Sequence, residues 1–347
     1  MEQDALRAEP QSGPSLAVRG YIYGHLPCVL VYRGNYAHPM TERVQYDEFS
    51  MFHENASEYG LPYAAAPLVR REFVQCSADR RLSALVWGDE SPTIVFLHGG
   101  AQNAHTWDTV ALAMGIAVLC IDLPGHGHSD SAGAYDASAM PLAQNANDIA
   151  TVIRALAPHA QMIVGMSLGG LTTLALTRDH DELVPKMVLV DVTPGINQEK
   201  TKAITDFVNG PATFPSFEEL LERTMQFNPT RTMTSMRRGI LHNALQTADG
   251  SWVWRYRRDD APPLPQVKGE LKRPDTATLW DVFDAYNKPL MFVRGMRSQS
   301  VVSDEDEAEL LRRAPHTRVE HVQEAGHSVQ GDTPLELADL LLSFLAS

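Results

Sequence analysis

The chain has 347 residues, 44% of them hydrophobic, and a formal net charge of −14 at pH 7. The hydrophobic share excludes a globally disordered chain, and the length is enough for one large domain or two modest ones. The acidic balance argues against nucleic acid and anionic membrane surfaces as partners, because neither carries a charge that attracts the protein. Three scattered cysteines are too few for a disulfide framework or a zinc site.

Residues 1–70 differ in composition from the rest of the chain and are predicted to form an N-terminal extension. The start, MEQDALRAEPQSG, lacks the basic and apolar runs of a secretory signal. No stretch approaches the ~18 apolar residues of a membrane-spanning helix, so a cytoplasmic location is expected. The runs YIYGHLP, YRGNYAHPM and EYGLPYAAAP are too aromatic for a flexible tail. We expect the extension to pack on the body of the protein or at the subunit interface of a homo-oligomer.

From about residue 71 onward, short apolar runs recur along the chain and indicate strands. EFVQC and LSALVW have the composition of a strand pair. The runs that follow are almost continuously apolar, which is typical of strands buried on both faces of a parallel sheet. The predicted strands are 72–76, 82–87, 93–100, 116–122, 162–167 and 187–191, and the apolar runs resume at 289–293 and 318–322.

Amphipathic stretches between these strands predict helices. Apolar residues three and four positions apart form one stripe over residues 142–156. Another helix is expected near 304–313, where Ser303 precedes an acidic first turn. The last helix starts at Pro334, with Thr333 and Glu336 predicted to form a capping box. Strands that alternate with helices predict an α/β fold whose sheet is mainly parallel.

The alternation stops between residues 192 and 288, which separate two parts of the predicted core, 71–191 and 289–347. The early part of this segment has a polar, helical pattern, and the later part is irregular and rich in proline. A long insertion between two strands of a sheet predicts a helical cap domain over the edge of the sheet. Trp252 and Trp254 are candidates to line an apolar substrate pocket, or else to form the core of the cap.

Two glycine-rich turns contain candidate groups for acyl-transfer chemistry. Gly165-Met-Ser167-Leu-Gly169 is a G-x-S-x-G pattern between a predicted strand and a predicted helix, where a strained turn presents a nucleophilic serine. Ser167 is therefore the candidate nucleophile. His98-Gly-Gly100 follows another strand, and backbone N–H groups at such a turn can stabilise an oxyanion. The proposed donors are the N–H groups of Gly100 and Leu168.

Two further segments contain histidine after predicted strands. Asp122-Leu-Pro-Gly-His-Gly-His-Ser-Asp130 has two, but no acidic segment of ligand spacing accompanies them, which favours a structural loop over a metal site. Gly326-His327-Ser328 follows the last predicted strand. A serine hydroxyl is a poor nucleophile until a base removes its proton, and imidazole titrates near neutral pH. His327 is therefore the candidate base.

The order HGG, DLPGHGHSD, GMSLGG and AGHSV resembles the α/β-hydrolase superfamily, and the resemblance covers residues 71–347. It implies an α/β-hydrolase fold, with a mostly parallel eight-stranded sheet flanked by helices and a helical cap inserted after the sixth strand. It also implies a nucleophile, an acid and a histidine in that chain order, and no cofactor. Family members with an aspartate nucleophile, such as epoxide hydrolases and haloalkane dehalogenases, are excluded because this chain has Ser167.

The acid of the triad is where the chain departs from the family pattern. Gln299 stands where an acid after the strand at 289–293 is usual, and a neutral amide cannot offset an imidazolium charge. Asp191 ends another strand, and the carboxyl ends of parallel strands open onto one crevice. Asp304 is the alternative, although it also fits the first turn of a helix. We predict Asp191 as the acid beside Ser167 and His327.

These residues favour a serine hydrolase that acts on a small carboxylic ester or lactone, with a hydrophobic or aromatic substrate. A second possibility is hydrolysis of a carbon–carbon bond in a ring-cleavage product, because relatives do this with the same triad. A third is a receptor-like relative without turnover, which only Gln299 supports. No metal or cofactor is expected.

Overall fold

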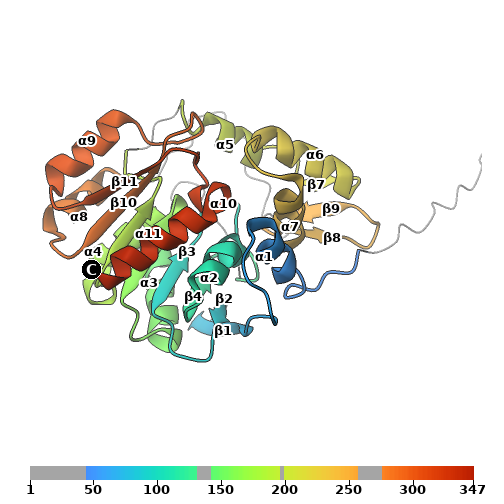
Figure 1. The fold of residues 1–347 in the computed structure, drawn as a ribbon, viewed down its shortest axis with the longest axis horizontal. Helices are drawn as coiled ribbons and strands as arrows, with labels where there is room; N and C mark the ends of the chain where they lie inside the picture. The colour runs from blue at the N-terminus through green and yellow to red at the C-terminus, as the bar shows by residue number, and fades with distance from the viewer. Residues whose placement is uncertain (1–43, 131–141, 196–198, 257–275) are drawn as a thin grey trace, which may run out of the picture. The chain divides into compact units, whose positions relative to one another are not determined.

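The computed structural model describes residues 44–130, 142–195, 199–256 and 276–347. Within these residues eight strands form one sheet, in the order β1-β2-β4-β3-β5-β6-β10-β11 (Figure 1). Strand β2 runs antiparallel to β1 and β4, and all other neighbours are parallel. This arrangement confirms the predicted α/β fold. The strands are β1 (Val69–Ser77), β2 (Arg80–Trp87), β3 (Ile94–Leu97), β4 (Val118–Ile121), β5 (Met162–Met166), β6 (Met187–Val190), β10 (Leu290–Gly295) and β11 (Arg318–Val322).

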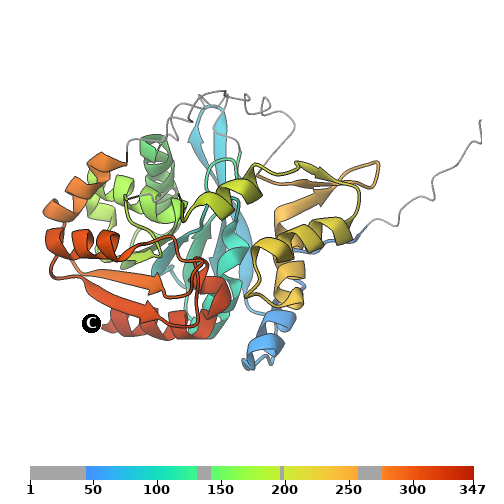
Figure 2. The same cartoon turned by 90° about the horizontal axis from the view of Figure 1, so that it is seen from above.

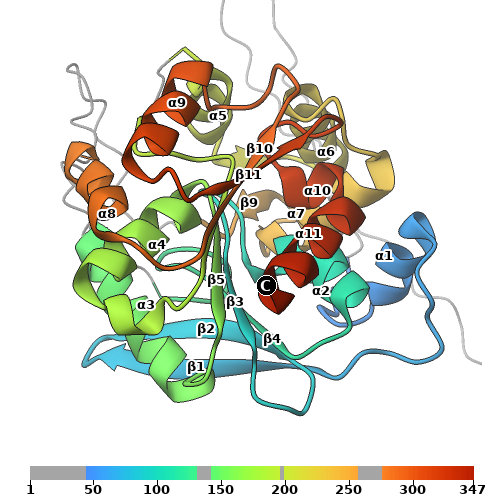
Figure 3. The ribbon, with the colours of Figure 1, turned by 60° about the vertical axis from the view of Figure 1, so that its left-hand side comes forward.

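The central strands are buried on both faces, as their continuous apolar sequences predict. Every residue of IVFL in β3, VLCI in β4 and MVLV in β6 is buried. Helices cover both faces of the sheet (Figure 3), and the apolar core is correspondingly divided into two clusters. One face packs against α3 (Leu142–Leu156), α4 (Leu168–Asp179), α8 (Trp280–Ala285) and α9 (Asp304–Arg313), and the other against α1 (Phe52–Tyr59), α2 (Asp108–Met114) and α11 (Pro334–Ala346). No helix of the described residues is long and apolar enough to cross a membrane.

The two predicted helix starts have different outcomes. Helix α9 begins with a capping box, in which the Ser303 hydroxyl accepts from the Asp306 N–H and Asp306 accepts from the Ser303 N–H. The capping box predicted at the last helix is wrong, although Pro334 does occupy its first turn. The Thr333 hydroxyl donates instead to the Val329 carbonyl at 3.5 Å, because the short helix α10 (Val329–Asp332) runs directly into α11.

The segment between β6 and β10 contains the helices that its early part predicts and also short strands that the sequence did not predict. Its described elements lie together beside the large sheet (Figure 2). Strands of two or three residues are too short to show an alternating pattern, and a hairpin turn at Gly250, with φ of 91°, brings two of them together. The elements are α5 (Lys202–Val208), β7 (Thr213–Phe214), α6 (Phe217–Phe227), α7 (Met233–Asn243), β8 (Ala244–Gln246) and β9 (Trp252–Trp254).

At its C-terminal end, the segment that packs as the insertion does not extend to the predicted boundary at residue 288. Leu279 and Phe283 are 1% exposed and lie in the same apolar cluster as Leu290 of β10. Residues 276–288 therefore pack with the large sheet, because their apolar side chains complete the core beside α4 and α9. The elements from α5 to β9 have an apolar cluster of their own.

Part of the predicted N-terminal extension lies outside the described residues, namely 1–43. The described remainder packs closely. Tyr46 and Met51 join the apolar cluster of the insertion, and Phe52 of α1 contacts Trp87 with ring centroids 4.9 Å apart. The contacts of Tyr46 and Met51 place the extension against the insertion, and the contact of Phe52 places it against the large sheet. An interface with a second subunit stays a prediction.

Candidate active site

Ser167 lies in the tight turn between β5 and α4, as the G-x-S-x-G pattern predicts. Its backbone has φ of 51° and ψ of −117°, a conformation that a residue with a side chain rarely adopts. The flanking glycines allow it, because a Cβ on Gly165 would lie 2.4 Å from Thr173 Oγ1 and one on Gly169 would lie 2.2 Å from the Leu97 carbonyl oxygen. The Ser167 hydroxyl makes no capping bond to α4, so it remains available for other chemistry.

His327 and Asp191 form a hydrogen-bonded pair at the carboxyl end of the sheet. His327 Nδ1 lies 2.9 Å from Asp191 Oδ2. The Asp191 side chain is fully buried, whereas the His327 side chain is 13% exposed. Asp191 directly follows β6 and has φ of 47°, and its N–H is held by the Val293 carbonyl at 2.8 Å. The strand end thus turns its carboxylate toward a loop 136 positions away in the chain.

The loop after β10 supplies donors to this carboxylate rather than an acid. The Gly295 N–H and the Ser300 hydroxyl donate to Asp191 Oδ1 at 3.1 and 2.6 Å. The Val301 N–H donates to Oδ2 at 3.1 Å. Together with His327 these groups surround the Asp191 carboxylate with donors.

Gln299 and Asp304 occupy other positions. A Cβ on Gly326 would lie 2.8 Å from the Cβ of Gln299, so Gln299 packs beside the turn that contains His327. The Asp304 carboxylate is 88% exposed and pairs with Arg294 at 2.7 Å. Asp304 therefore has the helix-terminal role that its sequence setting suggested, and the structure brings Asp191 rather than Asp304 to the histidine.

The glycine turn after β3 is held by two neutral histidines. His98 Nε2 accepts from the Leu123 N–H at 2.9 Å, so His98 Nδ1 carries the proton and donates to the Gly99 carbonyl at 2.7 Å. Burial, together with the nearby His126, lowers the pKa of His98 to about 3. A Cβ on Gly100 would meet no atom within 4 Å. The N–H groups of Gly100 and Leu168 donate to no atom of the described residues.

The DLPGHGHSD segment is a structural loop, as the sequence favoured. Asp122 is fully buried and accepts from the Ala104 N–H at 2.7 Å and the His128 N–H at 3.0 Å. It also pairs with Arg71 at 2.8 Å. His126 Nε2 accepts from the Ala101 N–H at 3.1 Å, so this histidine supports the glycine turn.

Trp252 and Trp254 lie in the apolar core of the insertion. They are 4% and 3% exposed. Trp252 contacts Phe217 edge-on at 5.1 Å between ring centroids, and Trp254 stacks on Tyr256 at 5.5 Å. These contacts match the alternative that the sequence left open, a role in packing, and a role in substrate binding stays a prediction.

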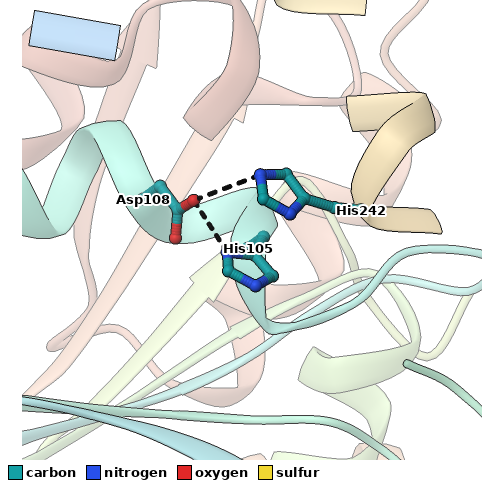
Figure 4. A group of neighbouring side chains, drawn as sticks. All are labelled: His105, Asp108 and His242. Atoms are coloured by element: carbon teal, nitrogen blue, oxygen red, sulfur yellow. Dashed lines mark hydrogen bonds and ion pairs between the residues drawn. The ribbon is translucent and has the colours of Figure 1, made fainter. Parts of the chain in front are cut away.

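A buried ionic cluster that sequence reasoning missed lies where the extension, the large sheet and the insertion meet. The ligand atoms of His105, Asp108 and His242 lie within 4.8 Å of one another (Figure 4). The two imidazoles are stacked, with centroids 3.7 Å apart and planes 13° from parallel. Parallel rings direct their nitrogen lone pairs along separate planes, so this geometry suits an ion network better than a shared metal ion.

His105 is the cation at the centre of this cluster. Its Nδ1 lies 2.9 Å from Asp108 Oδ2 and its Nε2 lies 3.3 Å from Glu48 Oε2. Burial disfavours the imidazolium, but the charge and hydrogen bond of Asp108 and the hydrogen bond of Glu48 outweigh it and raise the pKa of His105 to about 9. His242 stacks beside it, and burial keeps the pKa of His242 well below its ordinary value. The sequence held no signal for this cluster, because Glu48 and His242 are distant in the chain from His105 and Asp108.

The cluster predicts a stability that falls in alkaline solution. Between pH 6.5 and about 9 the folded chain holds a proton on His105 that the unfolded chain has released, so folding loses this contribution as the pH rises. His105→Gln should lower the free energy of unfolding at pH 6, and the difference from wild type should shrink at pH 10. Urea unfolding at both values measures this, with the exposed His159→Gln as control. An equal difference at both values contradicts the assignment.

Comparisons with known proteins agree with this architecture. The family model for the alpha/beta hydrolase fold matches residues 92–334. The esterase Rv0045c of Mycobacterium tuberculosis (strain ATCC 25618 / H37Rv) is 43% identical over 306 residues, which are 86% of this chain and 96% of that protein. A solved structure of the M. tuberculosis esterase Rv0045c matches with a TM-score of 0.73 and 41% identity, covering 88% of this chain and all of that chain.

A more distant relative is a 3-hydroxybutyrate-oligomer hydrolase of Cupriavidus necator, 28% identical over 282 residues, which are 78% of this chain and 95% of that protein. The chain belongs to the α/β-hydrolase fold family. The family and the esterase relative together support an esterase-type hydrolase.

Proposed function

We propose that the protein is a serine hydrolase that cleaves a carboxylic ester or lactone through an acyl-enzyme. The observation that carries the proposal is the 2.9 Å hydrogen bond between His327 Nδ1 and Oδ2 of the buried Asp191. It lies at the carboxyl ends of the strands, where Ser167 follows β5. Ser167 is the nucleophile, His327 the general base and Asp191 the acid. The esterase relative, 43% identical, favours an ester over a carbon–carbon bond as the scissile group.

The roles of the three residues follow from their protonation chemistry. Asp191 accepts from His327 Nδ1, which leaves Nε2 as the nitrogen that takes the proton of Ser167. The serine oxygen then bonds to the ester carbonyl carbon, and collapse of the tetrahedral intermediate expels the alcohol as His327 returns the proton. Water attacks the acyl-enzyme in the second half by the same route, and releases the acid. The Asp191 carboxylate stabilises the imidazolium and is itself held by donors from Gly295, Ser300 and Val301.

The N–H groups of Gly100 and Leu168 are the proposed oxyanion donors. Leu168 begins α4, so its N–H is one of the groups that a helix start leaves without an intrahelical partner. Gly100 lies in the turn that His98 and His126 support. In the tetrahedral intermediate these two donors would receive the charge that develops on the carbonyl oxygen.

The insertion from α5 to β9 is the proposed cap. The aromatic composition of this segment is the basis for proposing hydrophobic or aromatic acyl or alcohol groups in the substrate. Trp252 and Trp254 then act mainly by keeping the cap folded.

The test combines covalent labelling with a substrate panel. A fluorophosphonate should label the wild-type protein once per chain, at Ser167. Aryl esters of increasing acyl length, aromatic lactones and a dienoic diketone should then be compared. Turnover of esters or lactones with none of the diketone supports the proposal. Absence of labelling and of turnover would instead support a receptor-like relative, and cleavage of the diketone alone would support carbon–carbon hydrolysis.

A further inference from the structure

The proposed oxyanion turn contains a residue in an unfavourable backbone conformation. Ala101, which follows Gly100, has φ of 59°. A residue with a Cβ adopts this left-handed region only where its surroundings hold it there. The Gly100 N–H belongs to the peptide between Gly99 and Gly100, immediately before Ala101 in the same turn, so the contacts that hold Ala101 also limit how this donor can be oriented.

Both backbone polar groups of Ala101 are held by side chains. Its N–H donates to His126 Nε2 at 3.1 Å, and its carbonyl accepts from Asn243 Nδ2 at 2.5 Å. His126 Nδ1 donates to the Pro124 carbonyl at 3.0 Å, which leaves Nε2 as the acceptor. One of the two supports therefore comes from the loop after β4 and the other from α7.

The orientation of the Asn243 amide is fixed by its second contact. Asn243 Oδ1 accepts from Asn103 Nδ2 at 3.2 Å, so its nitrogen must face the Ala101 carbonyl. Asn103 in turn caps the 3-10 helix η1 (Ala104–Trp107) by accepting from the His105 N–H at 2.9 Å. Asn243 is the last residue of α7, and its own carbonyl accepts from the Arg255 N–H at 2.9 Å.

We propose that Asn243 is a positioning residue for the reaction, through which the insertion holds the oxyanion turn in its active shape. The inference rests on the proposed function, since it assigns a role in the same site. An insertion that only covered the substrate would need no hydrogen bond to this turn. Loss of the Asn243 donor frees the Ala101 carbonyl, Ala101 then relaxes from φ of 59° toward an ordinary conformation, and this change in the turn displaces the neighbouring Gly100 N–H.

The experiment compares Asn243→Ala with Asn228→Ala. Asn228 caps the C-terminus of α6 in the same insertion, and among the described residues its side chain donates to the Thr224 carbonyl alone, at 2.9 Å. For Asn243→Ala we expect kcat for an aryl ester to fall about tenfold to a hundredfold, a part of what loss of a whole oxyanion donor costs. KM should change less than about threefold, because the ground-state ester makes little use of the donor. Asn228→Ala should keep the wild-type kcat.

A second readout separates positioning from simple damage. A trifluoromethyl ketone forms a tetrahedral oxyanion adduct with a nucleophilic serine, so its Ki should rise by the same factor as kcat falls. Asn243→Asp serves if the alanine variant unfolds, because it keeps the shape and the acceptor for Asn103 but replaces the donor to Ala101. It should show the same loss of kcat and the same weaker inhibition.

The outcomes separate a failure of the proposed positioning role from a failure of the proposed hydrolase function. If the wild type is labelled by a fluorophosphonate and turns over esters, but both Asn243 variants keep wild-type kcat and Ki, the positioning role is wrong and the hydrolase remains. A change confined to KM, or an equal loss in Asn228→Ala, also overturns it. A wild type that is neither labelled nor active removes both proposals.

Discussion

Ser167→Ala is expected to lower ester turnover by about 10⁴- to 10⁶-fold while the protein stays folded. The hydroxyl is the only group that the substitution removes, and without it no acyl-enzyme can form. The strained turn also loses no packing, because the β-carbon and the flanking glycines remain. Steady-state hydrolysis of an aryl ester measures the effect, and the far-ultraviolet circular dichroism and thermal unfolding of the variant should match wild type.

A matched control for this variant is Ser77→Ala. The Ser77 hydroxyl donates to Asp79 at 2.8 Å in the turn between β1 and β2, outside the site. This control should keep full activity and full fluorophosphonate labelling. If Ser167→Ala retains the wild-type rate, or is still labelled at one site per chain, the serine mechanism is refuted.

Asp191→Asn is expected to lower kcat by about 10²- to 10⁴-fold. An asparagine keeps one acceptor oxygen but places its NH2 group against other donors, and it cannot offset the charge on His327 or specify the tautomer that accepts the serine proton. The same substitution at Asp304 removes an ion pair of an 88% exposed carboxylate with Arg294 and should leave kcat within about twofold. Because both variants exchange a carboxylate for an amide, the comparison isolates position.

The two aspartate variants also test whether the loop after β10 supplies the acid. Stability should be followed by urea unfolding, since Asp191 is buried among donors and its replacement changes their partners. A loss of rate in Asp304→Asn alone would mean that this loop rearranges to supply the acid. Full activity in both variants would mean that the enzyme works with Ser167 and His327 alone.

Much of the fold was predictable because its signals are local. Continuous apolar runs such as 94–97 and 187–190 are typical of strands buried on both faces, and the structure has strands there. The turn at Ser167 was predictable for a similar reason, since Gly165 and Gly169 leave no room for a side chain at that crossing. The sequence failed to predict the absence of a capping bond at Thr333 and the two- and three-residue strands of the insertion. At these places the packing of neighbouring elements determines the local structure.

The sequence by itself determined the α/β fold, the turn that presents Ser167 and the position of His327 after the last strand, because each depends on residues adjacent in the chain. It favoured Asp191 over Asp304 as the acid, and only the tertiary structure showed which of the two carboxylates lies beside His327. Asp191 turns to His327 because its backbone adopts φ of 47° and because Gly295, Ser300 and Val301 converge on its carboxylate. Those contacts, like that of Asn243 with Ala101, join residues more than 100 positions apart, and no local pattern encodes such distances.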